Sequence, residues 1–244
     1  MRIDILTLFP EMFSGVLTSS IISRAIEKKI IEVNVHDFRE YSNKANKRVD
    51  DYSYGGGAGM IIEIQPVLDC LRSIEGWQEA YKILTTPVAR TYNQKTAFSL
   101  REKEHIIIIC GHYEGIDSRI LNYIDEVISI GDYILTGGEL AAMVIFDSVV
   151  RLLPGVLGNS LSIEEESFSQ SLLEFPQYTR PIVFEDMIVP EVLVSGNHEN
   201  IRKWRRYKSL EATYKYRKDL LEKTDLTKED LVFLNKIEGE DNEK

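Results

Sequence analysis

The sequence is poor in cysteine and lacks any long apolar run. Its 244 residues include only two cysteines, Cys70 and Cys110, too few for a disulfide-stabilised extracellular fold, and we expect both thiols to be reduced and buried. No apolar stretch approaches the ~20 residues of a membrane-spanning helix. Residues 1–9 carry Asp4 within an apolar pattern, which favours a strand over a secretory leader. The sequence therefore predicts a cytoplasmic protein with no membrane partner.

Several common nucleotide-binding and catalytic motifs are also missing. The chain contains no G-x-G-x-x-G fingerprint, no G-x-x-x-x-G-K-[ST] loop and no G-x-S-x-G elbow. Their absence argues against the usual dinucleotide-binding enzymes, P-loop NTPases and α/β-hydrolases. The four histidines are scattered and form no zinc-binding pattern. Ligand spacing therefore predicts no metal site.

Positive charge is concentrated in one segment. The formal net charge of −10 argues, taken alone, against a nucleic-acid partner. Between Ile201 and Lys218, however, eight basic residues accompany one acidic residue, and four aromatic residues are interleaved with them. Clustered charge and flat rings suit RNA, although a solvated helix with its aromatic side chains in the core gives the same pattern. On this segment alone, the solvated helix is the favoured interpretation.

Apolar segments rich in β-branched residues alternate with amphipathic segments in the first part of the chain. We expect strands over 2–9, 31–38, 81–86, 105–110 and 127–130, and helices over 11–29, 66–76, 93–101, 116–124 and 139–153. The third strand is expected to end at Pro87. The last helix is almost wholly apolar, so we expect it to be deeply buried. The alternation predicts an α/β fold with a parallel sheet.

The hydrophobic periodicity of strands and helices is lost after Pro154, and prolines recur at 176 and 181. A stretch of this length without regular structure is unusual inside a compact domain. We therefore expect a first domain over residues 1–160, an interdomain linker over 161–176 and a small all-helical domain over 177–244. Within the last, Thr227 is a candidate helix N-cap with Asp230 at the N3 position, close to a capping box.

Two glycine-rich segments carry most of the functional information. Residues 110–117 and 130–140 each begin where an apolar strand stops, and each combines glycines and carboxylates in a turn. The carboxylates are Glu114, Asp117, Asp132 and Glu139. Open α/β sheets bind ligands at the carboxyl ends of their strands, and glycine lets bare backbone approach a ligand closely. Such a pocket suits a zwitterionic ligand that carries a nucleoside.

Further motifs run along nearly the whole chain. They are Leu8-Phe-Pro-Glu-Met-Phe13, Val49-Asp-Asp51, Tyr54-Gly-Gly-Gly-Ala-Gly-Met60, Asp147-Ser148, Pro154-Gly-Val-Leu-Gly158, Tyr178-Thr-Arg-Pro181 and Leu193-Val-Ser-Gly-Asn-His198. With residues 110–117 and 129–140, they make the chain similar to the bacterial tRNA (guanine-N1)-methyltransferases, a family of the SPOUT class of knotted methyltransferases.

This resemblance implies an activity and an architecture. The family transfers the methyl group of S-adenosylmethionine to N1 of the guanosine immediately 3′ of the anticodon, tRNA position 37. It is homodimeric, and each active site is built from both subunits. The resemblance also implies a SPOUT-type parallel sheet with a C-terminal deep trefoil knot that binds the methyl donor, in residues 1–160, and a tRNA-binding role for the helical domain. Knots are too rare to be proposed from sequence rules.

The resemblance assigns residues to the donor pocket. The matching positions are Leu84, Thr85, Thr86 and Pro87 in a first loop, Gly111, Tyr113, Glu114 and Gly115 in a second, and Ser129, Ile130, Gly131, Tyr133, Leu135, Gly137 and Gly138 in a third. Glu114 is also a candidate for contact with the sulfonium region or with Mg²⁺. The Mg²⁺ cofactor is implied by the family and by no ligand spacing in this sequence.

Catalysis requires two further groups. Guanine N1 carries a proton, so methylation needs a general base at N1 and a positive group near O6. The family uses an arginine, matched here by Arg151, and an aspartate followed by Ser-Phe, whose position is occupied by Glu166. The extra methylene matters because a misplacement of about 1 Å can lower a rate by about 100-fold. We favour Glu166 as the base; alternatives are Glu165 in that role, a slow enzyme, or a solvated glutamate linker.

The family also implies which residues face RNA. We expect Gly57 and Gly59 to face the tRNA or the other subunit. We expect Arg180 and His198 to contact RNA or to order the linker, and Arg202 and Arg205 to contact the tRNA. With the family in view, we expect the basic segment to contact the tRNA backbone. Two other functions stay open: a related knotted methyltransferase that acts on rRNA or on a ribose 2′-hydroxyl, and a non-catalytic RNA-binding homologue.

Overall fold

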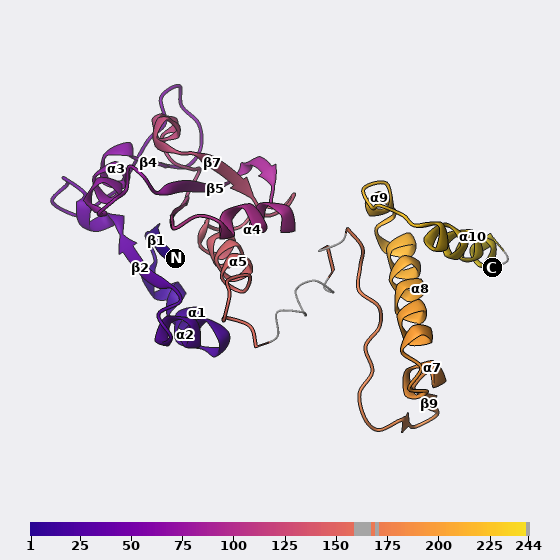
Figure 1. The fold of residues 1–244 in the computed structure, drawn as a ribbon. Helices are drawn as coiled ribbons and strands as arrows, with labels where there is room; N and C mark the ends of the chain where they lie inside the picture. Colours follow the sequence, from indigo (N-terminus) through magenta and orange to yellow (C-terminus); the bar gives the residue numbers. More distant parts are fainter. Residues whose placement is uncertain (159–166, 169–170, 243–244) are drawn as a thin grey trace. The chain divides into compact units, whose positions relative to one another are not determined.

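A computed structural model of the chain describes residues 1–158, 167–168 and 171–242. The chain divides into two compact units, Met1–Gly158 and Asn159–Lys244, coloured indigo to rose and orange to yellow in Figure 1. Of the predicted linker, 161–176, the structure describes residues 167–168 and 171–176.

Five parallel strands form the sheet of the first unit. They are β1 (Arg2–Thr7), β2 (Glu32–Asp37), β5 (Tyr81–Thr91), β6 (His105–Cys110) and β7 (Glu126–Ser129). Their order is β2-β1-β6-β5-β7, and every neighbouring pair is parallel. The predicted α/β class with a parallel sheet is confirmed. Because the strands share one direction, the loops that follow them leave from the same edge of the sheet.

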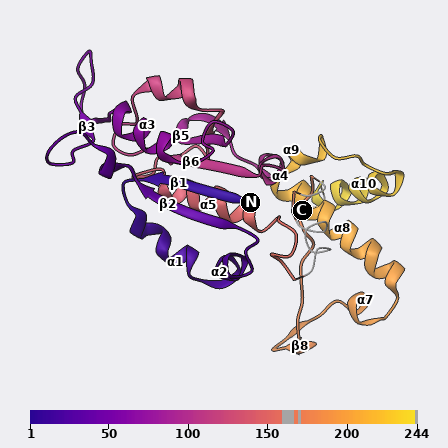
Figure 2. The same ribbon diagram turned by 60° about the vertical axis from the view of Figure 1, so that its left-hand side comes forward.

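The helices of the first unit are short. They are the 3-10 helices η1 (Pro10–Phe13), η2 (Phe38–Tyr41) and η3 (Ser118–Tyr123), and the α-helices α1 (Ser14–Leu17), α2 (Ser20–Glu27), α3 (Ile64–Ser73), α4 (Gln94–Arg101) and α5 (Glu139–Val150). A small antiparallel pair, β3 (Asp50–Asp51) with β4 (Ile61–Ile62), precedes α3. Figure 2 shows α3 and α5 on opposite sides of the sheet, so both of its faces are covered.

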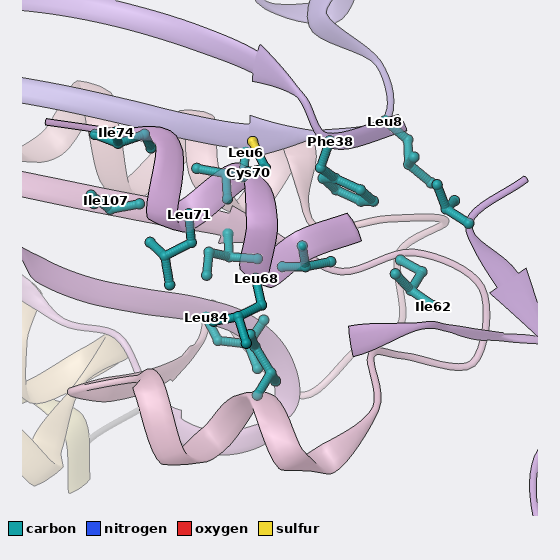
Figure 3. Close-up of a cluster of buried hydrophobic side chains, with 14 of the residues drawn as sticks. Leu6, Leu8, Phe38, Ile62, Leu68, Cys70, Leu71, Ile74, Leu84 and Ile107 are labelled. Atoms are coloured by element: carbon teal, nitrogen blue, oxygen red, sulfur yellow. The ribbon is translucent and has the colours of Figure 1, made fainter. Parts of the chain in front are cut away.

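One face of the sheet packs against α3. Buried apolar side chains from the sheet and from α3 form one cluster there, to which Ile107 and Ile109 of β6 belong. The alternating neighbours Ile106 and Ile108 are buried on the opposite face. Figure 3 shows the side chains that meet here, among them Leu6, Leu84 and Ile107 from the sheet, Leu68, Cys70 and Leu71 from α3, and Ile74 just after that helix. Burial on both faces accounts for the continuous apolar sequence of the strands.

Both cysteines are free and buried, as predicted. Burial raises the pKa of Cys70 to about 12, and burial raises the pKa of Cys110 well above its usual range. Both thiols therefore stay protonated at neutral pH, where a thiol is a poor nucleophile.

One predicted helix is interrupted, and another is of the 3-10 type. The expected helix over 11–29 is broken into η1, α1 and α2, and Ser20, the first residue of α2, has a φ of 56°. A positive φ interrupts a right-handed helix. The expected helix over 116–124 is the 3-10 helix η3, whose N-cap Asp117 accepts from the Arg119 N–H.

The sequence predicted that the third strand ends at Pro87, but β5 continues to Thr91. It pairs with β7 on both sides of an irregularity between Thr85 and Arg90. Proline has no N–H to donate to a ladder, and the bulge removes it from the pairing. The bulge also leaves Val88 exposed at the edge where ligands are expected.

A buried carboxylate lies in β1. Asp4 is fully buried, and its two carboxylate oxygens lie 2.7 Å from His36 Nε2 and 2.7 Å from His105 Nε2. Arg2 Nε donates to the same carboxylate at 2.8 Å. Burial alone would raise the pKa of Asp4, but the hydrogen bonds from these three partners outweigh burial and lower the pKa to about 2.

Asp4→Asn is expected to lower the free energy of unfolding by about 2 kcal/mol at neutral pH. A carboxyl whose folded pKa is depressed stabilises the fold above its unfolded pKa, near pH 4, and that stabilisation is lost as the pH falls toward about 2. Urea unfolding of both proteins therefore shows a difference that narrows below about pH 4. Equal stability at pH 7 would contradict the ion-pair assignment.

The second unit is mainly helical in its described part. Its helices are α7 (Glu191–Val194), α8 (His198–Tyr216), α9 (Lys218–Leu221) and α10 (Lys228–Asn242). A short hairpin of β8 (Val183–Phe184) and β9 (Met187–Ile188) precedes them and was not predicted. Leu172, Leu210 and Ile237 form a small core. No helix in either described part of the chain is long and apolar enough to cross a membrane.

The predicted helix start at Thr227 is confirmed. Thr227 N donates to Asp230 Oδ2 at 2.8 Å, and Asp230 N donates to Thr227 Oγ1 at 3.2 Å, which closes the capping box. Asp230 also accepts from Arg206 Nε of α8 at 2.7 Å. The cap and the ion pair together join the start of α10 to α8.

Candidate functional site

Three loops at the carboxyl edge of the sheet contact one another. Gly138 N, just before α5, donates to Gly111 O, just after β6, at 2.7 Å. Thr85 Oγ1 in β5 donates to Gly138 O at 3.4 Å. His112 and Gly137 form an isolated antiparallel bridge. The structure thus brings together the three segments that the sequence analysis assigned to one pocket.

Glycine is required where these loops meet, because no side chain would fit. A Cβ on Gly138 would lie 2.2 Å from Thr85 Oγ1 and 2.8 Å from Gly111 N. A Cβ on Gly137 would lie 2.3 Å from Glu139 Oε2. Real Cβ atoms essentially never make contacts below 3.0 Å. The loops therefore meet through bare backbone.

The third loop folds back on itself. Gly131 N donates to Ser129 Oγ at 3.3 Å, and Ser129 Oγ donates to Gly131 O at 3.1 Å. The Tyr133 hydroxyl donates to Ile130 O at 3.3 Å. A Cβ on Gly131 would lie 2.4 Å from the Tyr133 ring, so this glycine allows the exposed tyrosine to lie along the loop.

The predicted donor-binding residues differ in exposure. Leu84, Thr85, Ser129 and Gly138 are buried, Thr86, Gly111, Gly115, Ile130, Gly131, Leu135 and Gly137 are half-buried, and Pro87, Tyr113, Glu114 and Tyr133 are exposed. Buried backbone surrounded by a few exposed aromatic and polar side chains is typical of small-molecule sites.

A fourth segment reaches the second loop. Glu114 N donates to Met60 O at 3.0 Å. A Cβ on Gly59, whose φ is +86°, would lie 2.4 Å from Glu114 Cγ. Gly59, predicted to face RNA, therefore lies against Glu114, predicted to bind the donor. Gly57, the other predicted RNA contact in this segment, is exposed.

A polar cluster that no sequence pattern predicted lies behind these loops. Glu139 is only 2% exposed, and its Oε1 accepts from Thr7 Oγ1 at 2.8 Å. Glu139 Oε2 lies 4.0 Å from His112 Nδ1. That nitrogen is buried and has no hydrogen-bond partner in the described part of the chain. The sequence indicated only that Glu139 is one of four carboxylates in or beside the two glycine-rich segments.

Of the two predicted catalytic residues, the structure describes only Arg151. Arg151 is the C-cap of α5, a helix of 12 residues, which is about 18 Å long. Gly138 and the three loops lie at the other end of that helix. Glu166, like Glu165, falls outside the described residues. Within one copy of the first unit, Arg151 is therefore distant from the loops.

The second unit contains a pocket of about 810 Å³. Three residues predicted to face RNA, His198, Arg202 and Arg205, line it beside the apolar side chains of Phe175 and Ile201. The fourth, Arg180, is exposed. A pocket that combines cationic groups with a ring can accept a phosphate or a base.

Much of the positive charge of α8 is paired within this unit. Arg202 bonds to Glu199 at 2.9 Å and to Glu229 at 3.4 Å. Arg206 binds Asp230 at 2.7 Å. Because exposed ion pairs are weak and exchange readily with other partners, a phosphate backbone can still compete for Arg202. The paired acids nevertheless make the available charge smaller than the residue count suggests.

Arg205 differs from its neighbours. Its Cζ lies 4.9 Å from the centroid of the Phe175 ring. Among the described residues, Arg205 makes no ion pair. A guanidinium that lies over a ring and has no acid partner keeps its full charge for a ligand.

Comparison with known proteins identifies the family. A profile described as "tRNA (Guanine-1)-methyltransferase TrmD" matches residues 1–223. The chain belongs to this family. It is 54% identical over 234 residues to a protein of Clostridium botulinum named tRNA (guanine-N(1)-)-methyltransferase, with 96% of this chain and 97% of the relative covered. Relatives of the same name from Dictyoglomus turgidum and Enterococcus faecalis are each 50% identical, over 98% and 99% of both chains.

The match to this methyltransferase family extends over both units. It includes the three loops at the sheet edge, the end of α5 and the whole of α8. The resemblance inferred from the sequence motifs is therefore confirmed at the level of the family.

Proposed function

We propose that the chain transfers the methyl group of S-adenosylmethionine to N1 of the guanosine immediately 3′ of the anticodon, at position 37 of tRNA. Membership of the tRNA (guanine-N1)-methyltransferase family supports the reaction. The structural observation that carries the proposal is the meeting of three glycine loops, with Gly138 N bonded to Gly111 O at 2.7 Å. A tRNA substrate implies a cytoplasmic enzyme.

The three loops fit an adenosyl ligand. At Gly137 and Gly138 an added Cβ would collide with neighbouring atoms, so only glycine lets the loops pack this closely. The exposed rings of Tyr113 and Tyr133 offer flat faces for a nucleoside. When bound, the donor supplies a methyl group on an electrophilic sulfonium. The contribution of the loops is to bind and orient the ligand and to exclude water.

We infer that these loops form the deep trefoil knot of the SPOUT class. Strand β5 precedes β6 and β7 in the chain and yet lies between them in the sheet. The segment after β7 then returns to Gly111, after β6, through Gly138. A later segment that comes back against two earlier loops supports such a crossing.

The reaction at guanine needs a base and a cation. Glu166 accepts the N1 proton and leaves a lone pair on N1 for methyl transfer. Arg151 donates to O6, where negative charge develops as the proton leaves. If Glu165 takes the part of the base, the role of Arg151 is unchanged.

We propose that the enzyme is a homodimer with shared active sites. Because α5 is about 18 Å long, a site that uses both the loops at its start and Arg151 at its end requires Arg151 from a second copy. Exposed apolar side chains on the first unit, Leu140 and Val144 of α5 and Met12 of η1, offer a surface for that copy.

The family also implies Mg²⁺, but the described residues do not offer a complete protein site. No group of three or more ligating side chains that could hold a metal ion is present among them. Asp117 is already engaged, because its hydrogen bond with Arg119 lowers the pKa of Asp117. Glu114 is an exposed carboxylate in the second loop, so we propose it as one ligand and assign no step to the metal.

Methyl transfer from labelled S-adenosylmethionine to a tRNA transcript tests the proposed function. A transcript with guanosine at position 37 is expected to gain methyl at N1, and one with adenosine there is expected to gain none. Methyl found only on rRNA or a ribose 2′-hydroxyl would support a related knotted methyltransferase. Donor binding without any product would support a non-catalytic RNA-binding homologue. Either result would overturn the proposal.

Arg205→Gln is expected to weaken tRNA binding by about 3- to 10-fold and to reduce the slope of log K against log salt by about one. The physical reason is the loss of a charge that has no acid partner among the described residues. Lys203→Gln is the matched control, since Lys203 is exposed on the same helix but paired with Glu199 and Glu229. Filter binding at several salt concentrations measures both, and equal losses would contradict a special role for Arg205.

A further inference from the structure

We propose that Glu139 and His112 are positioning residues of the methyl-donor site, and that their side chains close into a direct hydrogen bond when the donor binds. The inference rests on the proposed function, because it assumes that the three loops hold the donor. Neither residue is among the positions that the family resemblance assigns to the donor pocket. Their roles follow from burial, distance and hydrogen bonding in the first unit.

The carboxylate of Glu139 is prepared as an acceptor. Burying a carboxylate is unfavourable unless partners compensate, and Glu139 is only 2% exposed. Phe9 N donates to Thr7 Oγ1 at 2.9 Å, so the Thr7 hydroxyl proton is free to point at Glu139 Oε1, 2.8 Å away. The N-terminus of α5 also favours negative charge at its first residue. One oxygen is thus satisfied, and the other, Oε2, faces His112.

The imidazole of His112 is held just short of that oxygen. Its Nδ1 is buried without a hydrogen-bond partner among the described residues and lies 4.0 Å from Glu139 Oε2, about 1 Å beyond hydrogen-bond distance. The rings of Phe9 and Tyr113 flank it, each with its centroid 4.9 Å away. An unsatisfied buried nitrogen beside a buried carboxylate is an unfavourable arrangement that a small movement would relieve.

Gly137 connects this pair to the donor loops. A Cβ there would lie 2.3 Å from Glu139 Oε2 and 2.5 Å from His112 Nδ1, so its Cα lies against both groups. His112 is in the second loop and bridges Gly137 in the third. A hydrogen bond between His112 Nδ1 and Glu139 Oε2 would therefore link the second loop to α5 and restrict the movement of the third loop. The bond also fixes His112 as the Nδ1–H tautomer, with Nε2 left as an acceptor.

The first measurement follows the histidine rings by ¹⁵N NMR, with and without S-adenosylhomocysteine. We expect the His112 signals to move to the Nδ1–H tautomer on binding. His36 and His105, which contact Asp4 instead, are internal controls and are expected to stay unchanged. A contact that is merely structural would give the same His112 spectrum in both states.

The second measurement is calorimetric binding of S-adenosylhomocysteine to Glu139→Gln. Loss of a charged acceptor is expected to weaken binding by about 10-fold. Glu126→Gln is the matched control, because Glu126 also accepts a hydrogen bond from a hydroxyl, Tyr81 Oη at 3.1 Å. Glu126 is the first residue of β7, whereas the third loop follows the other end of that strand. This variant is expected to bind within about twofold of wild type. Thr7→Ser is expected to keep the affinity, and Thr7→Val to lose it.

The outcomes separate the two proposals. Wild-type protein that binds no S-adenosylhomocysteine would overturn the proposed function itself. Wild-type binding with an unchanged His112 tautomer, or with Glu139→Gln equal to wild type, would overturn this inference alone. If Glu139→Gln does not fold, the inference is tested by the affinities of Thr7→Ser and Thr7→Val and by the His112 signal of the wild-type protein.

Discussion

Glu166→Gln is expected to lower kcat by about 100-fold or more while leaving the affinity for S-adenosylhomocysteine within about twofold of wild type. Glutamine keeps the length and shape of the side chain but cannot take the N1 proton of guanine. Donor affinity is spared because the proposed donor contacts lie in the three loops of the first unit. Single-turnover methylation of the guanosine-37 transcript and calorimetry of donor binding measure the two quantities separately.

Two further variants identify the base. Glu166→Asp is expected to keep or raise turnover, because it restores the residue that the family uses. Glu165→Gln changes the neighbouring carboxylate in the same way and is expected to have little effect. A Glu166→Gln enzyme with undiminished turnover would remove this residue from the mechanism, and a loss confined to Glu165→Gln would transfer the role to Glu165.

Gly138→Ala is expected to abolish donor binding and to destabilise the first unit by about 3 kcal/mol. The added Cβ would lie 2.2 Å from Thr85 Oγ1, 2.8 Å from Gly111 N and 3.0 Å from Cys110 Cα. Two of these atoms are backbone and cannot rotate away, so the loops must separate. The φ of Gly138 is −81°, which any residue adopts. The destabilisation is therefore expected to come from the steric clash and not from backbone strain. Urea unfolding and calorimetry with S-adenosylhomocysteine measure both effects.

Gly15→Ala is the control for this substitution. Gly15 lies in α1, and a Cβ there would meet nothing within 4 Å. Alanine is a better helix former than glycine, so this variant is expected to gain up to about 1 kcal/mol and to bind the donor normally. If Gly138→Ala behaved like Gly15→Ala, the close packing of the loops would be contradicted.

The elements predicted best are those whose signal is local or strongly apolar. All five strands of the sheet were expected, because strands buried on both faces carry nearly continuous apolar sequence. The start of α4 was also predicted, and Asn93 Oδ1 accepts from Thr96 N at 3.2 Å as an N-cap does. In both cases the residues that decide the structure are neighbours in the chain.

The failures share a different cause. The positive φ of Ser20 and the register shift in β5 around Pro87 depend on how distant elements pack, and no local pattern shows them. The hydrogen bond from Thr7 to Glu139 joins residues 132 positions apart, and no spacing rule relates them. The sequence located the loops of the candidate site, but the buried group behind them required the tertiary structure.

The order of strands in the sheet has a consequence for synthesis on the ribosome. Strand β1 pairs with residues 32–37 on one side and with residues 105–110 on the other. At about 5–20 residues per second, the nascent chain spends several seconds with β1 and β2 paired and one edge of β1 open. Such an edge readily pairs with strands of other chains. The growing polypeptide is therefore expected to need chaperone protection until β6 has left the ribosome.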